Sequence, residues 1–297
     1  MAQIKKAAFI LIIVPVVFLL IDCEGGGSSR KESDVIKVFA VNYPLAYFTE
    51  RIGGEHVRMI DILPKDTDPA EWAPGKKELR QIRSADLILL NGAGYEPWAE
   101  QAGLPSSKTV NATATLEDYF FPKQKKGRLI PDTWLDFDMS KFQAESVRNA
   151  LEKRLPAFKD EFENNFFALY AEMNKLNKRM VFISNKMDCD ILYLYAAHPV
   201  YDYMAAAYHI RLLNLYWEPG AVPTDEQWRF LEKSLENKPA NAMLWESPPP
   251  EDIRRKLEND FGIIPVIFNP CTQKPDTGDF ISVMKQNVDN LAEYSRY

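Results

Sequence analysis

Histidine is scarce in this chain of 297 residues, which contains only His56, His198 and His209. The sequence also has no H-E-x-x-H, G-x-S-x-G or G-x-x-x-x-G-K-[ST] motif, so it lacks the local signatures of zinc proteases, serine hydrolases and P-loop ATPases. Its three cysteines form no C-x-x-C pair, which argues against a cysteine metal cluster. We therefore do not expect an enzyme.

Positive charge is also limited, because 36 lysines and arginines face 42 acidic residues and the net charge is -6. The only dense basic block is "KQKKGR" at Lys123 to Arg128, which is too short to follow a phosphate backbone. Nucleic acid is therefore not an expected partner.

Long apolar runs are confined to the N-terminus, where Ala7 to Ile21 follows Lys5 and Lys6. This run is shorter than the roughly 20 residues of a membrane-spanning helix, so residues 1–22 are predicted to be a signal peptide. Cys23 and the Gly/Ser stretch after it resemble a bacterial lipoprotein signal, which implies that Cys23 carries lipid. Residues 23–34 would then be a flexible tether at the outer face of a membrane, and an uncleaved N-terminal anchor would lead to the same location.

Beyond the tether, short apolar runs alternate with helical patterns, which is typical of α/β proteins with parallel sheets. In the first half, strands are predicted at 35–41, 57–63 and 87–91, and a helix is predicted to open at Pro74. In the second half, strands are predicted in "RMVFIS", "ILYLYA", "IRLLNLYW", "NAMLWE" and "IIPVIF". The sequence "TDEQ" from Thr224 has the capping-box form that begins a helix.

A long helical pattern separates these halves, from about Ser140 to Lys178 with an interruption at Pro156. Its apolar residues recur at spacings of three and four, which gives the segment one apolar face. We expect two α/β lobes with parallel sheets, an N-terminal lobe at 35–156 and a C-terminal lobe at 179–297, joined by a long rigid helix at 157–178. A helix packed inside one large domain is the alternative.

Several ordered motifs carry a family resemblance. They include "YPLAYFTERIGG" from Tyr43, Asp68-Pro69, "ADLILLNGA" from Ala85, "TWLD" from Thr133 and "HPVYDYMAAAY" from His198. With "GDFISVMKQNVDNL" from Gly278, the set spans nearly everything after the tether, and it resembles the ZnuA/TroA-like solute-binding proteins of ABC transporters. The resemblance implies the TroA-like fold and a role in metal-ion uptake.

The resemblance also implies four metal ligands in the cleft between the lobes, and this chain departs from that pattern. His198 stands in the place of the third ligand, a histidine. The first histidine is replaced by Ala70, the second by Asp132, and the carboxylate near the last strand by Asn269. Only one imidazole and one carboxylate of the set remain, whereas a tight zinc site uses about four protein ligands, or three and a water.

Three interpretations of the cleft stay open. Neighbouring acids can complete an oxygen-rich site of Glu71, Asp132, His198 and Glu246, which would favour harder ions such as Mn²⁺. The cleft can instead take a chelated metal or an organic solute between aromatic walls. The residues considered for that wall include Trp72, Trp134 and Trp217, with Asn269 as a polar neighbour. In the third interpretation, the protein is a ligand-free accessory or adhesion lipoprotein.

Since the chain has no ATPase motif, its expected partners are the permease and the ATPase of an ABC transporter. We expect a monomer in the periplasm or at the outer face of the cytoplasmic membrane, with one zinc or manganese ion as transported ligand and no other cofactor. Whether Cys189 and Cys271 form a disulfide is left open by the sequence.

Overall fold

A computed structural model describes residues 34–65, 67–116, 132–187 and 192–295. All of them belong to one compact unit, Ser33–Tyr297. The predicted signal peptide, Cys23, the tether up to residue 33 and Cys189 lie outside the described residues. Among the residues that are described, no helix combines the length and the apolar character needed to cross a membrane.

The N-terminal lobe is built on a four-stranded sheet in which every neighbouring pair is parallel. Its strand order is β2-β1-β3-β4. The strands are β1 (Ile36–Ala40), β2 (Val57–Met59), β3 (Leu87–Leu90) and β4 (Thr109–Asn111). The connections contain α1 (Tyr43–Gly53), the short 3₁₀ helix η2 (Gly54–His56), α2 (Lys76–Ser84) and a second 3₁₀ helix η3 (Pro97–Gln101).

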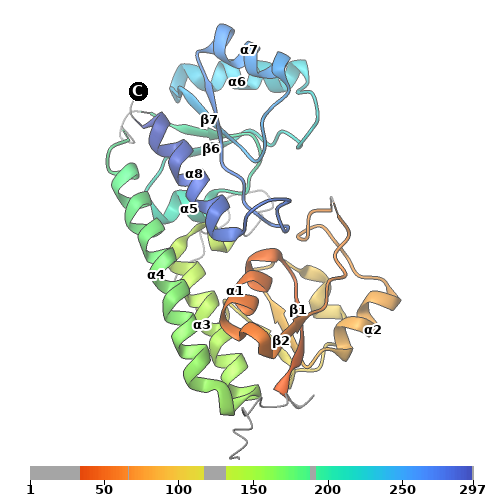
Figure 1. The fold of residues 1–297 in the computed structure, drawn as a ribbon. Coiled ribbons are helices and arrows are strands. Elements are labelled where there is room, and N and C mark those ends of the chain that lie inside the picture. Colours follow the sequence, from red (N-terminus) through yellow and green to blue (C-terminus); the bar gives the residue numbers. More distant parts are fainter. Residues whose placement is uncertain (1–33, 66, 117–131, 188–191, 296–297) are drawn as a thin grey trace, which may run out of the picture. The chain divides into compact units, whose positions relative to one another are not determined.

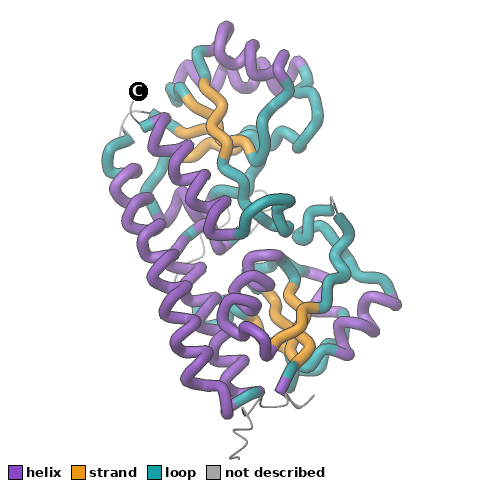
Figure 2. The backbone as a smooth tube through the Cα atoms, viewed as in Figure 1, coloured by secondary structure: helices purple, strands orange, loops and turns teal. Residues whose placement is uncertain are grey.

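The C-terminal lobe repeats this arrangement with a second parallel sheet, in the order β6-β5-β7-β8. Figure 2 shows the two sheets as separate groups of strands flanked by helices. The strands are β5 (Leu194–Ala196), β6 (Leu212–Asn214), β7 (Ala242–Trp245) and β8 (Ile264–Ile267). The helices are α5 (Asp202–Ala207), α6 (Asp225–Asn237), α7 (Glu251–Phe261) and α8 (Phe280–Tyr294). The predicted class, two α/β lobes with parallel sheets, is confirmed.

Two long helices lie between the sheets in the sequence. They are α3 (Phe137–Arg154), which follows the short 3₁₀ helix η4 (Thr133–Leu135), and α4 (Lys159–Ser184), which follows η5 (Pro156–Phe158). Helix α4 packs against α1 and α3 of the first lobe and against α8 of the second, so it runs along both lobes (Figure 1). Its buried stripe continues from Phe162 through Leu169 and Met173 to Ile183.

The strand predicted in "RMVFIS" is wrong, because Arg179 to Ser184 form the last turns of α4. Met180 and Ile183 extend the helical spacing of the buried stripe, and packing along that stripe outweighs the local preference of valine and isoleucine for strands. The helix predicted to open at Pro74 begins instead at Lys76, with Gly75 as its N-cap.

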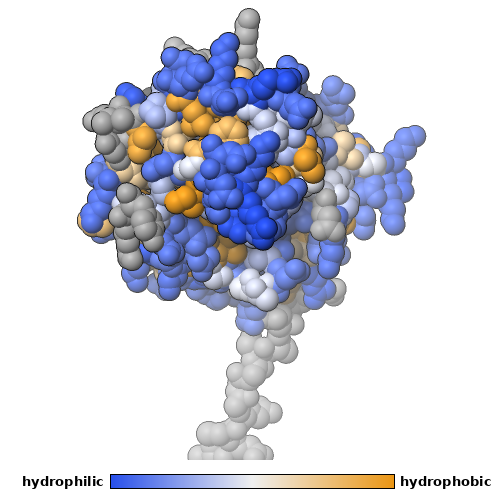
Figure 3. Space-filling view, turned by 90° about the horizontal axis from the view of Figure 1, so that it is seen from above, coloured by the Kyte–Doolittle hydropathy of each residue, from blue (hydrophilic) through white to orange (hydrophobic). Residues whose placement is uncertain are grey.

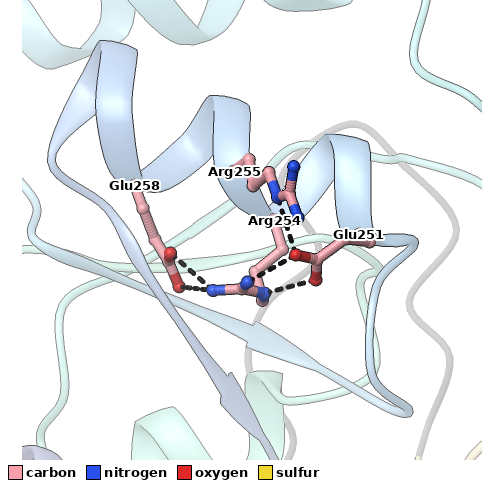
Figure 4. A network of polar contacts seen from close by, with 4 residues as sticks. All are labelled: Glu251, Arg254, Arg255 and Glu258. Carbon is pink, nitrogen blue, oxygen red and sulfur yellow. Dashed lines mark hydrogen bonds and ion pairs between the residues drawn. The ribbon is translucent and has the colours of Figure 1, made fainter.

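The capping box predicted at Thr224 is confirmed, since Thr224 and Gln227 exchange side-chain to backbone hydrogen bonds at the start of α6. Helix α7 turns two apolar residues, Ile253 and Leu257, to the core. Its outer surface carries Arg254 between Glu251 and Glu258, and Arg255 also pairs with Glu251 (Figure 4). Such exposed pairs add little to stability. The view from above shows hydrophilic side chains next to several apolar patches (Figure 3).

Candidate metal-binding cleft

A cleft of about 1050 Å³ is lined by residues of both lobes. Four ionisable side chains on its wall form the candidate site: Asp68, Asp132, His198 and Glu246. His198 and Glu246 follow strands of the second sheet, whereas Asp68 lies in the loop after β2 and Asp132 directly precedes η4. Ligand sites of open parallel sheets lie beyond the carboxyl ends of their strands, as these residues do.

Strand register brings His198 and Glu246 together. Ala196 of β5 pairs with Leu244 of β7, and extending this register by two residues puts His198 opposite Glu246. Their side chains meet, with Nδ1 of His198 2.7 Å from Oε1 of Glu246. Because Nδ1 is occupied, Nε2 is the ring nitrogen that an ion would take, and a carboxylate behind a histidine is a common arrangement at metal sites.

Opposing effects act on the pKa of His198. Burial lowers the pKa of His198, but the hydrogen bond to Glu246 and the charges of Glu246, Glu218 and Asp68 outweigh it, so the net pKa is raised. The imidazole is thus surrounded by negative charge that would equally attract a metal cation.

Asp132 is the most unusual side chain of the cleft. It is fully buried, and neither carboxylate oxygen has a hydrogen-bond partner among the described residues. Burial raises its pKa well above the usual range, and the charges of Asp68 and Glu246 raise it further. A buried carboxylate without a donor is costly unless a cation or a proton compensates it.

A buried polar network fixes the backbone that carries Asp132. The side chain of the next residue, Thr133, donates to Oδ1 of Asn91 at 3.2 Å. The Gln143 amide donates to the same oxygen at 2.9 Å and to Thr133 at 3.0 Å. All three residues are buried, so Asp132 is held at the cleft by contacts in which its own carboxylate takes no part.

Asp68 contributes a second acidic group from the first lobe. Its Oδ1 accepts a hydrogen bond of 2.9 Å from the backbone N–H of Ala70. Burial raises its pKa, as do the charges of Glu246 and Glu71, while that N–H and His198 lower it. Asp68 was not predicted as a ligand, because the family pattern directs attention to position 70. The signal available in the sequence was the carboxylate of Asp68 itself, two residues before position 70, where the family has a histidine.

The other predicted site residues have different surroundings. Glu71 is exposed next to Asp68 and is not part of the cleft wall. No tryptophan is among the described residues that line the cleft. Trp72 packs edge-on against Trp98, and Trp217 lies in the second core between Trp228 and Trp245. Trp134 is buried and donates to the backbone oxygen of Pro270 at 2.7 Å.

Asn269 lines the cleft, but its amide oxygen accepts a hydrogen bond of 2.7 Å from the N–H of Cys271. Cys271 itself is a buried free thiol. Among the described residues, no three histidine, cysteine or acidic side chains lie close enough together to hold an ion in this arrangement of the lobes. The candidate ligands thus face one cleft as two groups, the His198–Glu246 pair and the two aspartates.

The fold and this cleft define a class: two-lobed α/β binding proteins of the TroA-like fold, with a long connecting helix. Among solved structures, the Zn(II)-bound ZnuA-like domain of Streptococcus pneumoniae AdcA has a TM-score of 0.76 at 20% identity, covering 89% of this chain and 100% of that domain. The chain spans 58% of a longer AdcA structure. The periplasmic zinc-binding protein TroA of Treponema pallidum has a TM-score of 0.69 at 18% identity, covering 88% of this chain and 99% of TroA.

The chain belongs to the family of ZnuA, the periplasmic component A of the zinc-uptake complex, which it matches over residues 38–294. The manganese ABC transporter substrate-binding lipoprotein PsaA of Streptococcus pneumoniae is 25% identical over 97% of this chain and 98% of PsaA. The iron ABC transporter substrate-binding lipoprotein MtsA of Streptococcus pyogenes is 25% identical over the same shares of each chain. Members of this family are substrate-binding proteins and not enzymes, so this chain is a substrate-binding protein of metal uptake.

Proposed function

We propose that this protein captures one divalent transition-metal ion between its lobes and delivers it to the permease of an ABC importer, whose ATPase supplies the energy. The observation that carries the proposal is the buried Asp132 carboxylate, which has no hydrogen-bond donor among the described residues and faces a cleft shared with His198 and Glu246. Binding a cation there removes the cost of the uncompensated charge.

The proposed ligands are Nε2 of His198 and carboxylate oxygens of Asp132 and Asp68. Glu246 holds the His198 ring from behind through Nδ1 and does not itself ligate the ion. The ligands come from both sides of the cleft, so a small approach of the lobes would complete the site. Glu71 would add negative charge next to Asp68 without reaching the ion. In this set Asp68 takes over the role that the family pattern assigns to a histidine at position 70.

This ligand set is rich in oxygen, with two carboxylates for one imidazole. Hard ions such as Mn²⁺ prefer carboxylate oxygen, whereas imidazole and thiolate suit Zn²⁺. We propose that the site discriminates less in favour of Zn²⁺ than a histidine-rich site does, and that Mn²⁺ is its transported ion.

For the location, we propose a monomer held by lipid on Cys23 at the outer face of the cytoplasmic membrane, with residues 23–34 as tether. The lipoprotein relatives, together with the apolar run before Cys23, support this anchor. Labelling of cells with a radioactive fatty acid, with Cys23→Ser as control, tests it.

The test of metal binding uses purified protein stripped with a chelator and titrated with Mn²⁺ and Zn²⁺ by calorimetry, with bound metal counted by elemental analysis. We expect about one ion per chain. Asp132→Asn and His198→Ala should each weaken binding by more than about 100-fold, since loss of an outer-sphere partner alone costs 10- to 100-fold.

The matched control is His209→Asn, at an exposed histidine whose positive φ of 55° asparagine tolerates. It should bind metal like the wild type. Absence of metal from the wild-type protein, or full binding by both cleft variants, would contradict the proposal.

A further inference from the structure

A segment between β8 and α8 connects the two lobes at the edge of the cleft. We call this segment, Asn269 to Asp279, the strap. Most of its residues line the cleft. In Figure 1 it is the dark blue loop before α8, and it reaches toward the orange loop that follows β2.

Both ends of the strap are fixed to the second lobe. The Asn287 side chain of α8 accepts from the N–H of Asn269 at 2.9 Å and donates to its carbonyl oxygen at 2.7 Å. At the other end, Asp279 caps α8 by accepting from the N–H of Ser282 at 2.8 Å. Between these ends, Cys271 has a positive φ of 58°, a conformation that persists only where the surroundings determine it.

The strap also makes hydrogen bonds to the first lobe. The carbonyl oxygen of Thr272 accepts from the N–H of Tyr43 at 3.0 Å, which satisfies a donor of the first turn of α1. Tyr47 of the same helix donates to Asp279 at 3.1 Å. The strap therefore belongs to the second lobe by its anchors and contacts the first lobe by its middle and its end.

One strap side chain reaches the loop that carries Asp68. The Gln273 amide Nε2 donates to the carbonyl oxygens of Pro64, at 3.3 Å, and of Thr67. Thr67 directly precedes Asp68, and the described residues from Ile60 to Asp68 contain no helix or strand. A loop without regular structure depends on such single bonds for its position.

We propose that Gln273 is a positioning residue, which holds Asp68 at the metal site and couples this ligand of the first lobe to the second lobe. The inference rests on the proposed function, because it assigns Asp68 a ligand's role. Gln273 is not one of the proposed ligands, and its effect on binding passes through Asp68.

A double-mutant cycle tests the coupling, with Mn²⁺ affinity measured calorimetrically for the wild type, Gln273→Ala, Asp68→Asn and the double variant. Gln273→Ala should weaken binding about tenfold, the value of one ordinary hydrogen bond. In the Asp68→Asn background the same change should cost less than about twofold, because the residue that Gln273 positions no longer ligates.

Two further variants separate positioning from a general effect on folding. Gln273→Glu keeps the size of the side chain but turns a carboxylate oxygen toward two carbonyl oxygens, so it should weaken binding at least as much as alanine. Gln286→Ala, at an exposed glutamine of α8 outside the cleft lining, should bind like the wild type. Hydrogen exchange in the metal-free protein should be faster at residues 60–68 in Gln273→Ala and unchanged in Gln286→Ala.

Wild-type affinity in Gln273→Ala would overturn this inference alone, as would an equal loss in both backgrounds of the cycle. Absence of metal binding in the wild type would overturn the proposed function, and this inference with it. A tenfold loss that disappears in the Asp68→Asn background, together with faster exchange at 60–68, supports the coupling.

Discussion

Glu96 is a buried acid that serves the backbone and not the ion. Its carboxylate accepts hydrogen bonds from the N–H groups of Asn91, at 3.2 Å, and Gly92, at 2.8 Å. These bonds hold the loop after β3, in which Gly92, Ala93 and Gly94 all have positive φ. The hydrogen bonds lower the pKa of Glu96, but burial outweighs them and raises it from 4.5 to about 7.

This raised pKa predicts that Glu96 makes the folded protein less stable as pH rises from 4.5 to about 7. In that window the folded state keeps the proton and the unfolded state releases it, so the stabilisation is complete below pH 4.5 and lost above 7. The contribution is about 3 kcal/mol at most. In urea titrations with chelator present, the free-energy difference between wild type and Glu96→Gln should fall by this amount across the window.

The neighbouring exposed acid Glu100 provides the control for this pH dependence. Glu100→Gln should follow the wild-type profile. If the difference between wild type and Glu96→Gln were constant from pH 4 to 8, the carboxyl would have no raised pKa in the folded state.

The contribution of single residues to the cleft could be predicted only in part. His198, Asp132, Glu246 and Asn269 were expected at the cleft, and all four line it. Asp68 was missed and Glu71 expected in its place, because the turn Asp68-Pro69-Ala70, closed by a side-chain to backbone bond, decides which acid faces inward. The spacing of residues along the chain does not predict the contacts on which that turn depends.

At the scale of elements, most strands and helices follow from apolar patterning, and the exceptions have physical causes. Strand β4 has only three residues, and all of them are partly exposed. No apolar run in the sequence therefore predicts this strand. Helix α7 is largely charged, with only Ile253 and Leu257 buried. The end of α4 resembles a strand locally, but Met180 and Ile183 continue the buried stripe of the helix. Helix α4 also packs against α8.

Helix α4 is the element whose core residues we expect to matter most for stability, since it packs against both lobes. Leu169 is fully buried on its inner face, and Leu169→Ala should reduce the free energy of unfolding by about 2–5 kcal/mol. Urea unfolding followed by circular dichroism measures the loss. Phe167, two residues earlier and 53% exposed, is the matched control, and Phe167→Ala should cost less than about 1 kcal/mol. Equal losses at the two sites would show that α4 is not a core element.

At the scale of the whole described unit, two lobes with parallel sheets are what the alternating pattern predicted, because parallel strands need crossover connections that usually contain a helix. The strand order that both sheets share was not predicted. What the pattern could not predict is how the lobes contact each other. The bonds from the Trp134 indole to Pro270, from Tyr43 to Thr272 and from Tyr47 to Asp279 join residues more than 130 positions apart. These contacts bridge the lobes independently of α4.

These bridges predict how far the lobes move when the ion binds. With α4 on one side and the strap on another, the lobes should rock slightly and not swing about a hinge, since packed helices shift by small shear movements. Small-angle X-ray scattering with chelator and with saturating Mn²⁺ should therefore show radii of gyration that differ by less than about 1 Å. The melting temperature should nevertheless rise with metal concentration, because the ion binds the folded form.

A variant that lacks two bridges, Tyr47→Phe with Gln273→Ala, should show a larger change in radius of gyration than the wild type. A large metal-induced compaction of the wild-type protein would show that neither α4 nor the strap restrains the lobes.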